Sequence, residues 1–298
     1  MGILSSIPVF GKPLISIANS LLQGKASVLY HLYKVWKPKY LNVGGGAYFV
    51  GFRWLNLEGI KSIANPYPFQ FNPSCKFPVK DKSIQTVYSS HALEHLSPDT
   101  VNRVLQESFR VLEPGGRLII KLPDFEKILK SWNARDESFF GEDWGFNSVT
   151  PTWKSRNIPD TLEYRAAMVF CGFWNDEFGH HFSKVYSGSG LNSEAPPAEG
   201  AYHGPPVTTI EKLNQIRAYS SPKLVANELR KIVIETEPNY HFNHQSAWSR
   251  DELSKLVESH GFNVKTTNSD QVLKFCADVK DVYNSLNISM YLLAFKPS

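Results

Sequence analysis

The sequence predicts an α/β protein with a doubly wound, mostly parallel sheet that is interrupted by a helical and aromatic insertion. Three observations predict this fold class. A short apolar run at 39–43 leads directly into three glycines, Gly44-Gly45-Gly46. From residue 53 to residue 122, β-rich runs alternate with helices and turns, which is the pattern of parallel strands joined by crossovers. The alternation stops near residue 131 and resumes near residue 248.

Each expected strand is a short run of apolar and β-branched residues between turn residues. These runs occupy 39–43, 53–57, 67–71, 84–90, 118–122, 262–266 and 290–295. A helix is expected to begin after Ser97, which can cap it ahead of Pro98, and to end at Pro114-Gly115-Gly116. A later helix should begin at Ser249 and end at His260-Gly261. This succession indicates a Rossmann-like sheet.

Residues 131–247 break the alternation and are rich in aromatic residues, His, Gly and Pro. Such a length is far beyond an ordinary connecting loop, so we expect an inserted lid subdomain with helices at 160–170 and 209–234. Residues 1–37 have apolar positions at helical spacing and are expected to form a helical cover. The sheet domain would then consist of residues 38–130 and 248–298.

Charge and cysteine usage narrow the functional class. The formal charge of +4, from 32 Lys and Arg against 28 Asp and Glu, is spread along the chain, so we expect no dedicated nucleic-acid surface. Cys75, Cys171 and Cys276 are few and far apart, which suits a reducing, cytoplasmic environment and matches no thiolate metal site. Because the chain has no stretch of 18 apolar residues, no transmembrane segment is expected.

The glycine turn and Glu58 give the first indication of a ligand. A strand that ends in a glycine turn brings backbone close to a nucleotide-like molecule. Glu58 follows the second strand, where a carboxylate can accept hydrogen bonds from both hydroxyls of a ribose. A dinucleotide site would need a third glycine where the chain has Phe49, and the Gly-Lys-Ser/Thr of a P-loop is missing. A nicotinamide enzyme and a P-loop protein are therefore disfavoured.

Four stretches together resemble one known family. They are LNVGGG (41–46), WLNLE (54–58), VYSSHALEHL (87–96) and RVLEPGGRLIIKLPD (110–124). In this order and spacing they resemble the class I S-adenosylmethionine-dependent methyltransferases, specifically the methyltransferase-11 type. The resemblance covers residues 39–130 and extends more weakly to 248–266. It implies S-adenosylmethionine as the cofactor.

The resemblance also implies roles for residues of this chain. The glycines would let the turn pass beneath the methionine part of the cofactor, and Glu58 would bind its ribose. Asn72 stands where the family often has an Asp near the adenine, and Asp81 lies in the loop before the fourth strand. The full set of cofactor-binding residues implied in this way is Asn42, Gly44, Gly45, Gly46, Glu58, Asn72, Asp81, Ser90 and His91.

A general base is needed if the methyl acceptor is a hydroxyl, and the sequence offers several candidates. By the resemblance, His91 would lie beside the transferring methyl. His181 and His244 come from the lid, and an imidazole titrates near neutral pH. Asp124 is a carboxylate alternative. We expect no metal site, because no ligand spacing links the histidines of the lid, which are His180, His181, His203, His241 and His244.

The sequence therefore predicts methyl transfer from S-adenosylmethionine to a small-molecule or glycan acceptor, with a hydroxyl favoured over an amine. Such an enzyme has chiefly to align the acceptor with the sulfonium and to exclude water. Two alternatives stay open. One is a non-catalytic binding protein on the same fold, because a fold does not fix a function. The other is a methyltransferase that acts on protein or nucleic acid.

Overall fold

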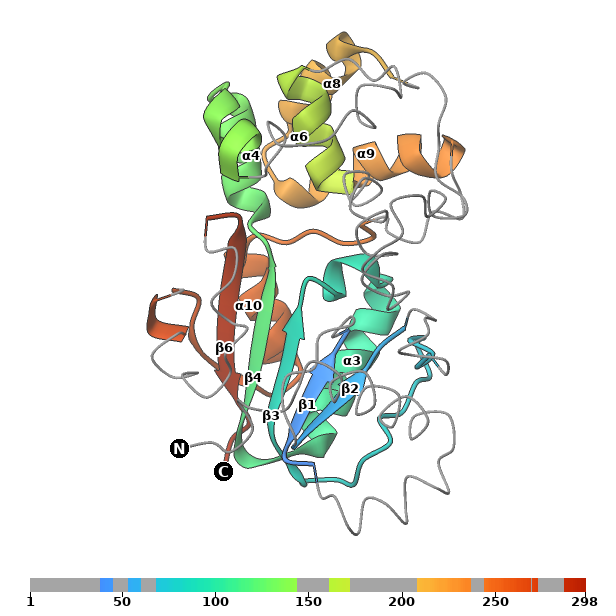
Figure 1. Ribbon diagram of the computed structural model, residues 1–298, viewed down its shortest axis with the longest axis vertical. Coiled ribbons are helices and arrows are strands. Elements are labelled where there is room, and N and C mark those ends of the chain that lie inside the picture. Colours follow the sequence, from blue (N-terminus) through green and yellow to red (C-terminus); the bar gives the residue numbers. More distant parts are fainter. Residues whose placement is uncertain are drawn as a thin grey trace, which may run out of the picture.

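A computed structural model shows a twisted sheet with a layer of helices above one end of its strands (Figure 1). The structure describes residues 38–44, 53–59, 68–143, 161–171, 208–236, 244–268, 270–272 and 287–298. The predicted helical cover at 1–37 lies outside the described residues, as do Gly45, Gly46 and His181.

Six strands form one sheet in the order β2-β1-β3-β4-β6-β5. Their bounds are Tyr40–Val43 (β1), Trp54–Leu57 (β2), Ile84–Ser90 (β3), Leu112–Pro123 (β4), Asn263–Thr266 (β5) and Ser289–Phe295 (β6). The strands β1 to β4 run parallel, whereas β6 lies antiparallel between β4 and β5. The doubly wound, mostly parallel sheet predicted from the sequence is therefore confirmed.

The predicted strand at 67–71 is wrong for its described part, because residues 68–71 run as irregular chain. One backbone hydrogen bond, from the Phe69 amide to the Glu58 carbonyl at 2.8 Å, attaches this segment to the end of β2. Phe69 and Phe71 are apolar at alternate positions, but both pack on the core beside the edge strand. The chain then turns at Asn72, whose Oδ1 accepts a hydrogen bond from the Ser74 amide.

The helix α3 (Pro98–Val111) begins as its cap predicts. Ser97 Oγ accepts a hydrogen bond from a backbone amide of the first turn, and the proline occupies the position where no amide is needed. Its apolar stripe at helical spacing is buried against the sheet and includes Val101, Val104 and Leu105. The predicted terminator Pro114-Gly115-Gly116 lies within β4 instead, where its backbone bonds to that of Lys296.

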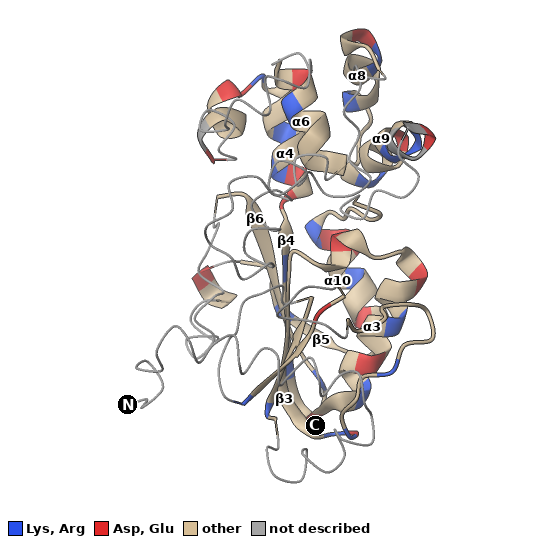
Figure 2. Cartoon of the chain, turned by 45° about the vertical axis from the view of Figure 1, so that its right-hand side comes forward, with Lys and Arg blue, Asp and Glu red and all other residues tan. Residues whose placement is uncertain are grey.

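The helix α10 (Arg250–Ser259) lies beside α3 on the same face of the sheet (Figure 2). It begins with the capping box formed by Ser249 and Glu252. The chain leaves the helix through Gly261, whose φ of +90° suits glycine, and a Cβ there would lie 3.0 Å from the Phe109 ring. The close approach explains why this junction between the two helices carries a glycine.

The helical layer contains α4 (Phe125–Asn133), α6 (Leu162–Cys171), α8 (Ile210–Arg217) and α9 (Pro222–Thr236), with a short π-helix, η3, at Phe139–Asp143. Phe170 lies 5.6 Å from Phe125 and 6.2 Å from Trp132 between ring centroids. The predicted helix at 160–170 corresponds to α6. The predicted helix at 209–234 is two helices, because the chain turns at 218–221 and Pro222 starts a new one.

One continuous cluster of buried apolar side chains runs from α3 and the sheet into α4, α6 and α9. α4, which opens directly from β4, carries this core upward into the helical layer. Since α4 packs with α6, the helical layer is joined to the central sheet through α4. Among the described residues, no helix is both long and apolar enough to cross a membrane.

Candidate active site

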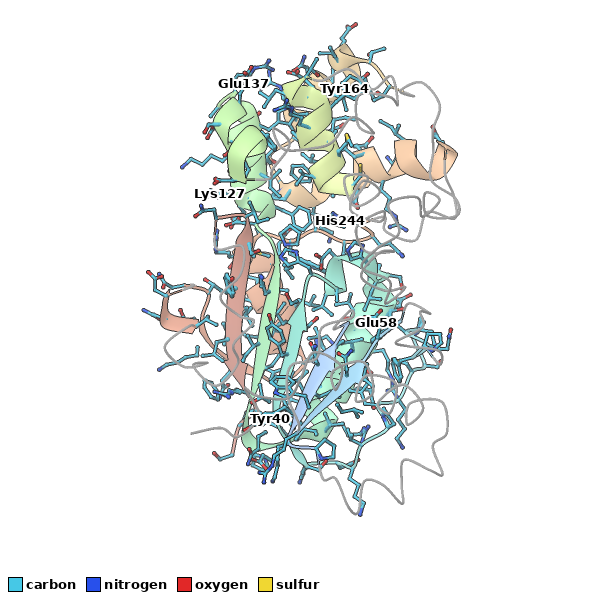
Figure 3. The ribbon with its side chains drawn as sticks, viewed as in Figure 1. Tyr40, Glu58, Lys127, Glu137, Tyr164 and His244 are labelled. Atoms are coloured by element: carbon cyan, nitrogen blue, oxygen red, sulfur yellow. The ribbon has the colours of Figure 1, made fainter. Side chains whose placement is uncertain are left out.

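Four parallel strands end at the edge of the sheet that faces the helical layer. Gly44 follows β1, Glu58 follows β2, His91 follows β3 and Asp124 follows β4. Figure 3 shows Glu58 near the end of β2 and His244 between the sheet and α6. Open α/β sheets bind their ligands at this carboxyl edge. The structure thus places four of the residues that the sequence assigned to the site, Gly44, Glu58, His91 and Asp124, along one edge.

Gly44 is packed so tightly that the chain accepts no side chain there. Its φ is +70°, and a Cβ would overlap the Cβ of Ala92, far inside van der Waals contact. Its amide donates to the Leu57 carbonyl at 2.7 Å, which fixes the turn against the end of β2. Asn42 on β1 is 3% exposed, and its Oδ1 accepts no hydrogen bond from any described residue. The start of the glycine turn is therefore pressed against the segment that follows β3.

Glu58 is 5% exposed, although it lies at the end of a strand. Its carbonyl accepts the hydrogen bond from the Phe69 amide, and Phe71 lies 3.1 Å from the place where a Cβ of Gly59 would stand. Two phenylalanines, stacked edge to face at 4.8 Å, therefore flank the carboxylate end of β2. The carboxylate of Glu58 is therefore carried at a buried position.

His91 has a strained backbone, with φ at +48°. Its amide donates to the Lys121 carbonyl at 2.8 Å, so the end of β3 is tied to β4. Its Nε2 lies 2.8 Å from Ser289 Oγ, and its Nδ1 lies 3.3 Å from Glu94 Oε1. The imidazole thus bridges β6 and the 3-10 helix η2 (Leu93–His95). Such strain at the carboxyl edge is typical of functional positions.

A second group of polar side chains lies directly behind His91. Glu94 is fully buried, and His244 is 6% exposed. Burial raises the pKa of the Glu94 carboxyl, but the contact with His91 and the charges of the nearby imidazoles lower it to about 2. Burial, with the neighbouring His95, lowers the pKa of His244 to about 3. Near neutral pH the group therefore holds a carboxylate beside an uncharged His244.

The segment that contains His244 is held by backbone bonds on both sides. The His244 amide donates to the Cys171 carbonyl at 3.1 Å, and its Nδ1 lies 3.0 Å from the Phe170 carbonyl oxygen. The amides of Gln245 and Ser246 both donate to the Glu94 carbonyl, at 2.6 and 3.1 Å. His95 and His244 stand edge to face with centroids 4.8 Å apart. The chain returning from the lid is thereby fixed against η2.

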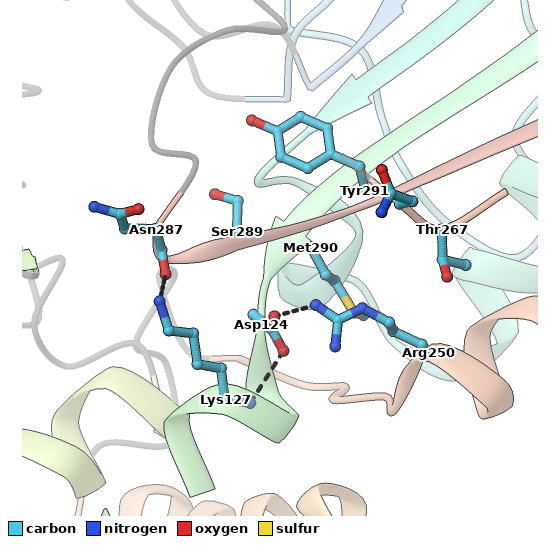
Figure 4. Close-up of a pocket in the computed structure, with 9 residues that line it drawn as sticks. Asp124, Lys127, Arg250, Thr267, Asn287, Ser289, Met290 and Tyr291 are labelled. Atoms are coloured by element: carbon cyan, nitrogen blue, oxygen red, sulfur yellow. Dashed lines mark hydrogen bonds and ion pairs between the residues drawn. The ribbon is translucent and has the colours of Figure 1, made fainter. Parts of the chain in front are cut away.

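Both carboxylate oxygens of Asp124 make contacts that stabilise the fold. Its Oδ1 accepts the Lys127 amide as the cap of α4, and its Oδ2 forms an ion pair with Arg250. Beside it lies a pocket of about 440 Å³ at the ends of β4, β5 and β6 (Figure 4). Its lining is mostly polar and comprises Asp124, Lys127, Arg250, Thr267, Asn268, Asn287, Ser289, Met290 and Tyr291. The hydroxyl of Ser289 connects this pocket to His91.

Two predicted cofactor residues make other contacts in the structure. Asp81 precedes β3, so it lies at the amino edge of the sheet, where it pairs with Arg110 at 2.6 Å. The motif-based interpretation was wrong here because the loop before a parallel strand lies opposite to the loop after it. Asn72 is exposed, and its side chain closes its own turn.

Sequence reasoning also missed partners of the site. Glu94 lies within the HALEHL stretch, but only its burial shows that it is more than a local partner of His91. Ser289 gave no signal, because it reaches His91 only through the pairing of β6 with β4. Ser90, next to His91, is half-buried at the end of β3.

Comparisons with known proteins bear on this site. Residues 61–120 match the family model described as a methyltransferase domain. No curated protein sequence matches the chain. Solved structures include an S-adenosylmethionine-dependent methyltransferase from Mesorhizobium loti, which is 13% identical and has a TM-score of 0.39 over 92% of this chain and 100% of that one.

Two further structures are similar at the same low level. A possible histamine N-methyltransferase from Thermotoga maritima is 11% identical, with a TM-score of 0.35 over 93% of this chain and 92% of that one. PKMT2 from Rickettsia typhi, solved with AdoHcy, is 11% identical, with a TM-score of 0.33 over 92% and 54%.

The described part of the matched segment 61–120 runs from residue 68 through β3 and α3 into β4. It therefore includes the turn into His91 and the packing surface of Gly44. S-adenosylmethionine is the cofactor of this family. The family match over residues 61–120, the glycine turn and the mostly parallel sheet together support a class I S-adenosylmethionine-dependent methyltransferase.

Proposed function

We propose that the protein transfers the methyl group of S-adenosylmethionine to a hydroxyl of a small-molecule or glycan acceptor. The observation that carries the proposal is the carboxyl edge itself. Gly44 presses against Ala92 with no room for a Cβ, and a buried Glu58 stands at the end of the neighbouring strand. A bare backbone turn next to a sheltered carboxylate suits a nucleoside that is held by its ribose.

The cofactor would be held by groups along this edge. Gly44, with Gly45 and Gly46, would pass beneath the methionine part, and Glu58 would accept hydrogen bonds from the ribose hydroxyls. The buried Asn42 Oδ1, which has no hydrogen-bond donor among the described residues, fits a polar group that reaches the turn. Ser90 and His91 would border the methionine end. Phe69 replaces Asn72 as our candidate neighbour of the adenine, because its amide bonds to Glu58.

The pocket beside Ser289 favours an acceptor rich in hydroxyl groups. Its lining offers the hydroxyls of Thr267, Ser289 and Tyr291 and the amides of Asn268 and Asn287. Together with the charged Asp124, Lys127 and Arg250, these donors and acceptors suit a sugar or a similar polyol better than an apolar ring. These groups would orient the acceptor hydroxyl toward the sulfonium, and the lid would exclude water.

His91 is the candidate base that the geometry favours. It alone among the described candidates stands both at the carboxyl edge and within 2.8 Å of the pocket residue Ser289. Asp124 is engaged by Arg250 and by the cap of α4. His244, with a pKa of about 3, would be a weak base near neutral pH. His181 lies outside the described residues.

Calorimetric titration with S-adenosylhomocysteine tests the cofactor site. We expect binding to the wild-type chain and an affinity at least about tenfold lower for Glu58→Gln, because a hydrogen bond to a charged group contributes about 1.5–3 kcal/mol. Glu137→Gln, on the exposed top of the lid (Figure 3), is the matched control and should bind as the wild type does. Equal affinity of Glu58→Gln and wild type would contradict the assignment of Glu58.

The acceptor is then sought by methyl transfer. Methyl-labelled S-adenosylmethionine would be incubated with panels of sugars, phenols, amines, RNA and protein. Label in a hydroxyl compound supports the proposal, and label in an amine alone corrects it to N-methylation. Label that enters only RNA or protein refutes the acceptor class. Cofactor binding with no transfer in any panel would favour a non-catalytic binding protein.

A further inference from the structure

Glu94, His95 and His244 form a compact set of potential metal ligands. Each offers one ligand atom, and the three atoms lie within 4.8 Å of one another. His95 and His244 are 149 positions apart in the sequence, so no short motif indicates that the three residues form a group. The return of the chain from the lid onto η2 is what brings them together, through the bonds of Gln245 and Ser246 to Glu94.

The Glu94 carboxylate is the strongest sign of a missing partner. It is fully buried, and neither of its oxygens accepts a hydrogen bond from a described residue. The Nδ1 of His91, at 3.3 Å from Oε1, is an ion-pair contact to one oxygen only. A buried carboxylate costs several kcal/mol unless it is paired, hydrogen-bonded or bound to a metal. The second oxygen, Oε2, is therefore available to a cation.

His244 is already oriented as a metal ligand would be. Its Nδ1 lies 3.0 Å from the Phe170 carbonyl oxygen, which can only accept a hydrogen bond, so Nδ1 carries the proton. Nε2 then keeps its lone pair. A ligating histidine almost always donates its other ring nitrogen to a carbonyl or carboxylate in this way. The Phe125 ring, edge to face at 5.7 Å, restricts rotation of the imidazole.

We propose that Glu94, His95 and His244 bind one divalent transition-metal ion of the Zn²⁺ class. Two imidazoles and one carboxylate are the donor set that Zn²⁺ accepts, at about 2.0–2.2 Å from each ligand atom. Tetrahedral ligands at that distance are about 3.4 Å apart, so the group has to contract by little more than an ångström at its widest. Small rotations of the half-buried His95 can provide this contraction.

The ion would have two effects on the molecule. It would join η2, at the end of β3, to the segment that returns from the lid. It would also leave a coordination position for water or for an oxygen of the acceptor, as three-ligand sites do. Polarising an acceptor hydroxyl next to His91 would favour its methylation; this second effect rests on the proposed function.

Metal binding is tested on the full chain after treatment with a chelator. ZnCl₂, MnCl₂ and MgCl₂ are titrated separately by calorimetry, and bound metal is measured by mass spectrometry after dialysis. We expect one Zn²⁺ per chain, weaker binding of Mn²⁺, little binding of Mg²⁺, and a rise in Tm with Zn²⁺ of roughly 4 °C or more. Co²⁺ is added as a spectroscopic probe, whose visible absorption should disappear when Zn²⁺ displaces it.

Two variants and one control locate the ion. Glu94→Gln keeps the shape of the side chain and His95→Ala removes a half-buried ring, and each should weaken Zn²⁺ binding at least tenfold. The matched control is His260→Ala at the end of α10, outside the cluster, which should bind as the wild type does. Circular dichroism shows whether each variant is folded.

Each possible outcome either supports or overturns the proposed metal site. Substoichiometric Zn²⁺ in the wild type, or binding that Glu94→Gln and His95→Ala leave unchanged, overturns the site. If either variant does not fold, the Co²⁺ spectrum of the wild type decides, since a spectrum without imidazole coordination also overturns it. Titration of each chain with S-adenosylhomocysteine distinguishes failure here from failure of the proposed function, because the proposed ribose contact, Glu58, lies outside the three proposed ligands.

Discussion

Replacing Gly44 by alanine tests whether the turn after β1 is shaped by close packing. Two costs add up. An alanine at a φ of +70° costs about 1–2 kcal/mol, because the left-handed region crowds a Cβ against the backbone. The overlap with the Ala92 Cβ costs about 1–3 kcal/mol more, as overpacking of a well-packed core does. The expected loss in the free energy of unfolding is therefore about 2–5 kcal/mol.

Gly115→Ala separates the two costs. Gly115 has nearly the same φ, +75°, but its Cβ would meet nothing within 4 Å. It should lose only the backbone cost, about 1–2 kcal/mol. The difference between the two variants measures the overlap. A further variant, Gly44→Ala with Ala92→Gly, removes one of the two colliding carbons and should recover most of that difference.

The assay is urea unfolding followed by circular dichroism, together with calorimetric binding of S-adenosylhomocysteine. Gly44→Ala should also bind the cofactor product at least about tenfold more weakly, a change that corresponds to about 1.4 kcal/mol, because the turn has to move. Equal destabilisation of Gly44→Ala and Gly115→Ala, or no recovery with Ala92→Gly, would show that packing against Ala92 is not what requires the glycine.

Three further predictions concern the stability of the scaffold. Burial raises the pKa of Glu107, but hydrogen bonds from Arg110 and the Phe77 amide bring it below its usual value. The contribution of the Glu107 carboxylate to stability is therefore complete above the unfolded pKa of about 4.3, and it is lost as the pH falls through the lower folded pKa. In Glu107→Gln, the free energy of unfolding measured with urea should change less between about pH 5 and pH 3 than it does in the wild type. Parallel wild-type and variant curves would refute this. Phe170→Ala should lower the free energy of unfolding by about 3–5 kcal/mol through loss of its contacts with Phe125 and Trp132, and a loss below about 1 kcal/mol would show that the lid core is not packed as described. Ser249→Ala should cost about 1 kcal/mol by removing the capping box, whereas Ser259→Ala at the other end of α10 should cost less; the reverse order in thermal unfolding would contradict the cap assignment.

Local signals in the sequence were sufficient for the elements with strong boundaries. Ser97 with Pro98, and Ser249 with Glu252, mark helix starts because a side-chain oxygen satisfies an amide that the helix cannot. Alternating apolar residues misled at Phe69 and Phe71, because these rings pack on the core although this segment joins no strand of the described sheet. The alternation of apolar residues indicates which side chains are buried, whereas a strand also needs a second strand to which its backbone can bond.

For the candidate site, too, local signals in the sequence predicted some positions, and others depended on the fold. The positions of Gly44, Glu58 and His91 at the carboxyl edge could be predicted because each stands directly after a strand, and parallel strands end at one edge. Asp81 was misplaced because its motif precedes a strand, and the polarity of the strand then puts it at the opposite edge. Glu94 lies in the HALEHL stretch, but its burial could not be predicted from the sequence. Its proximity to His244 depends on how the chain returns from the helical layer to the sheet, and no spacing in the sequence indicates this.

The position of β6 determines when the sheet can close during synthesis. β5 leaves the ribosome first, but in the described sheet it is attached only through β6, which lies between it and β4. Until β6 arrives, the long β4 strand offers an open edge from Arg117 to Pro123, and such an edge can pair with other chains. Pairing between distant segments also forms slowly. A nascent chain stopped before residue 289 should therefore aggregate rather than persist as a smaller folded unit.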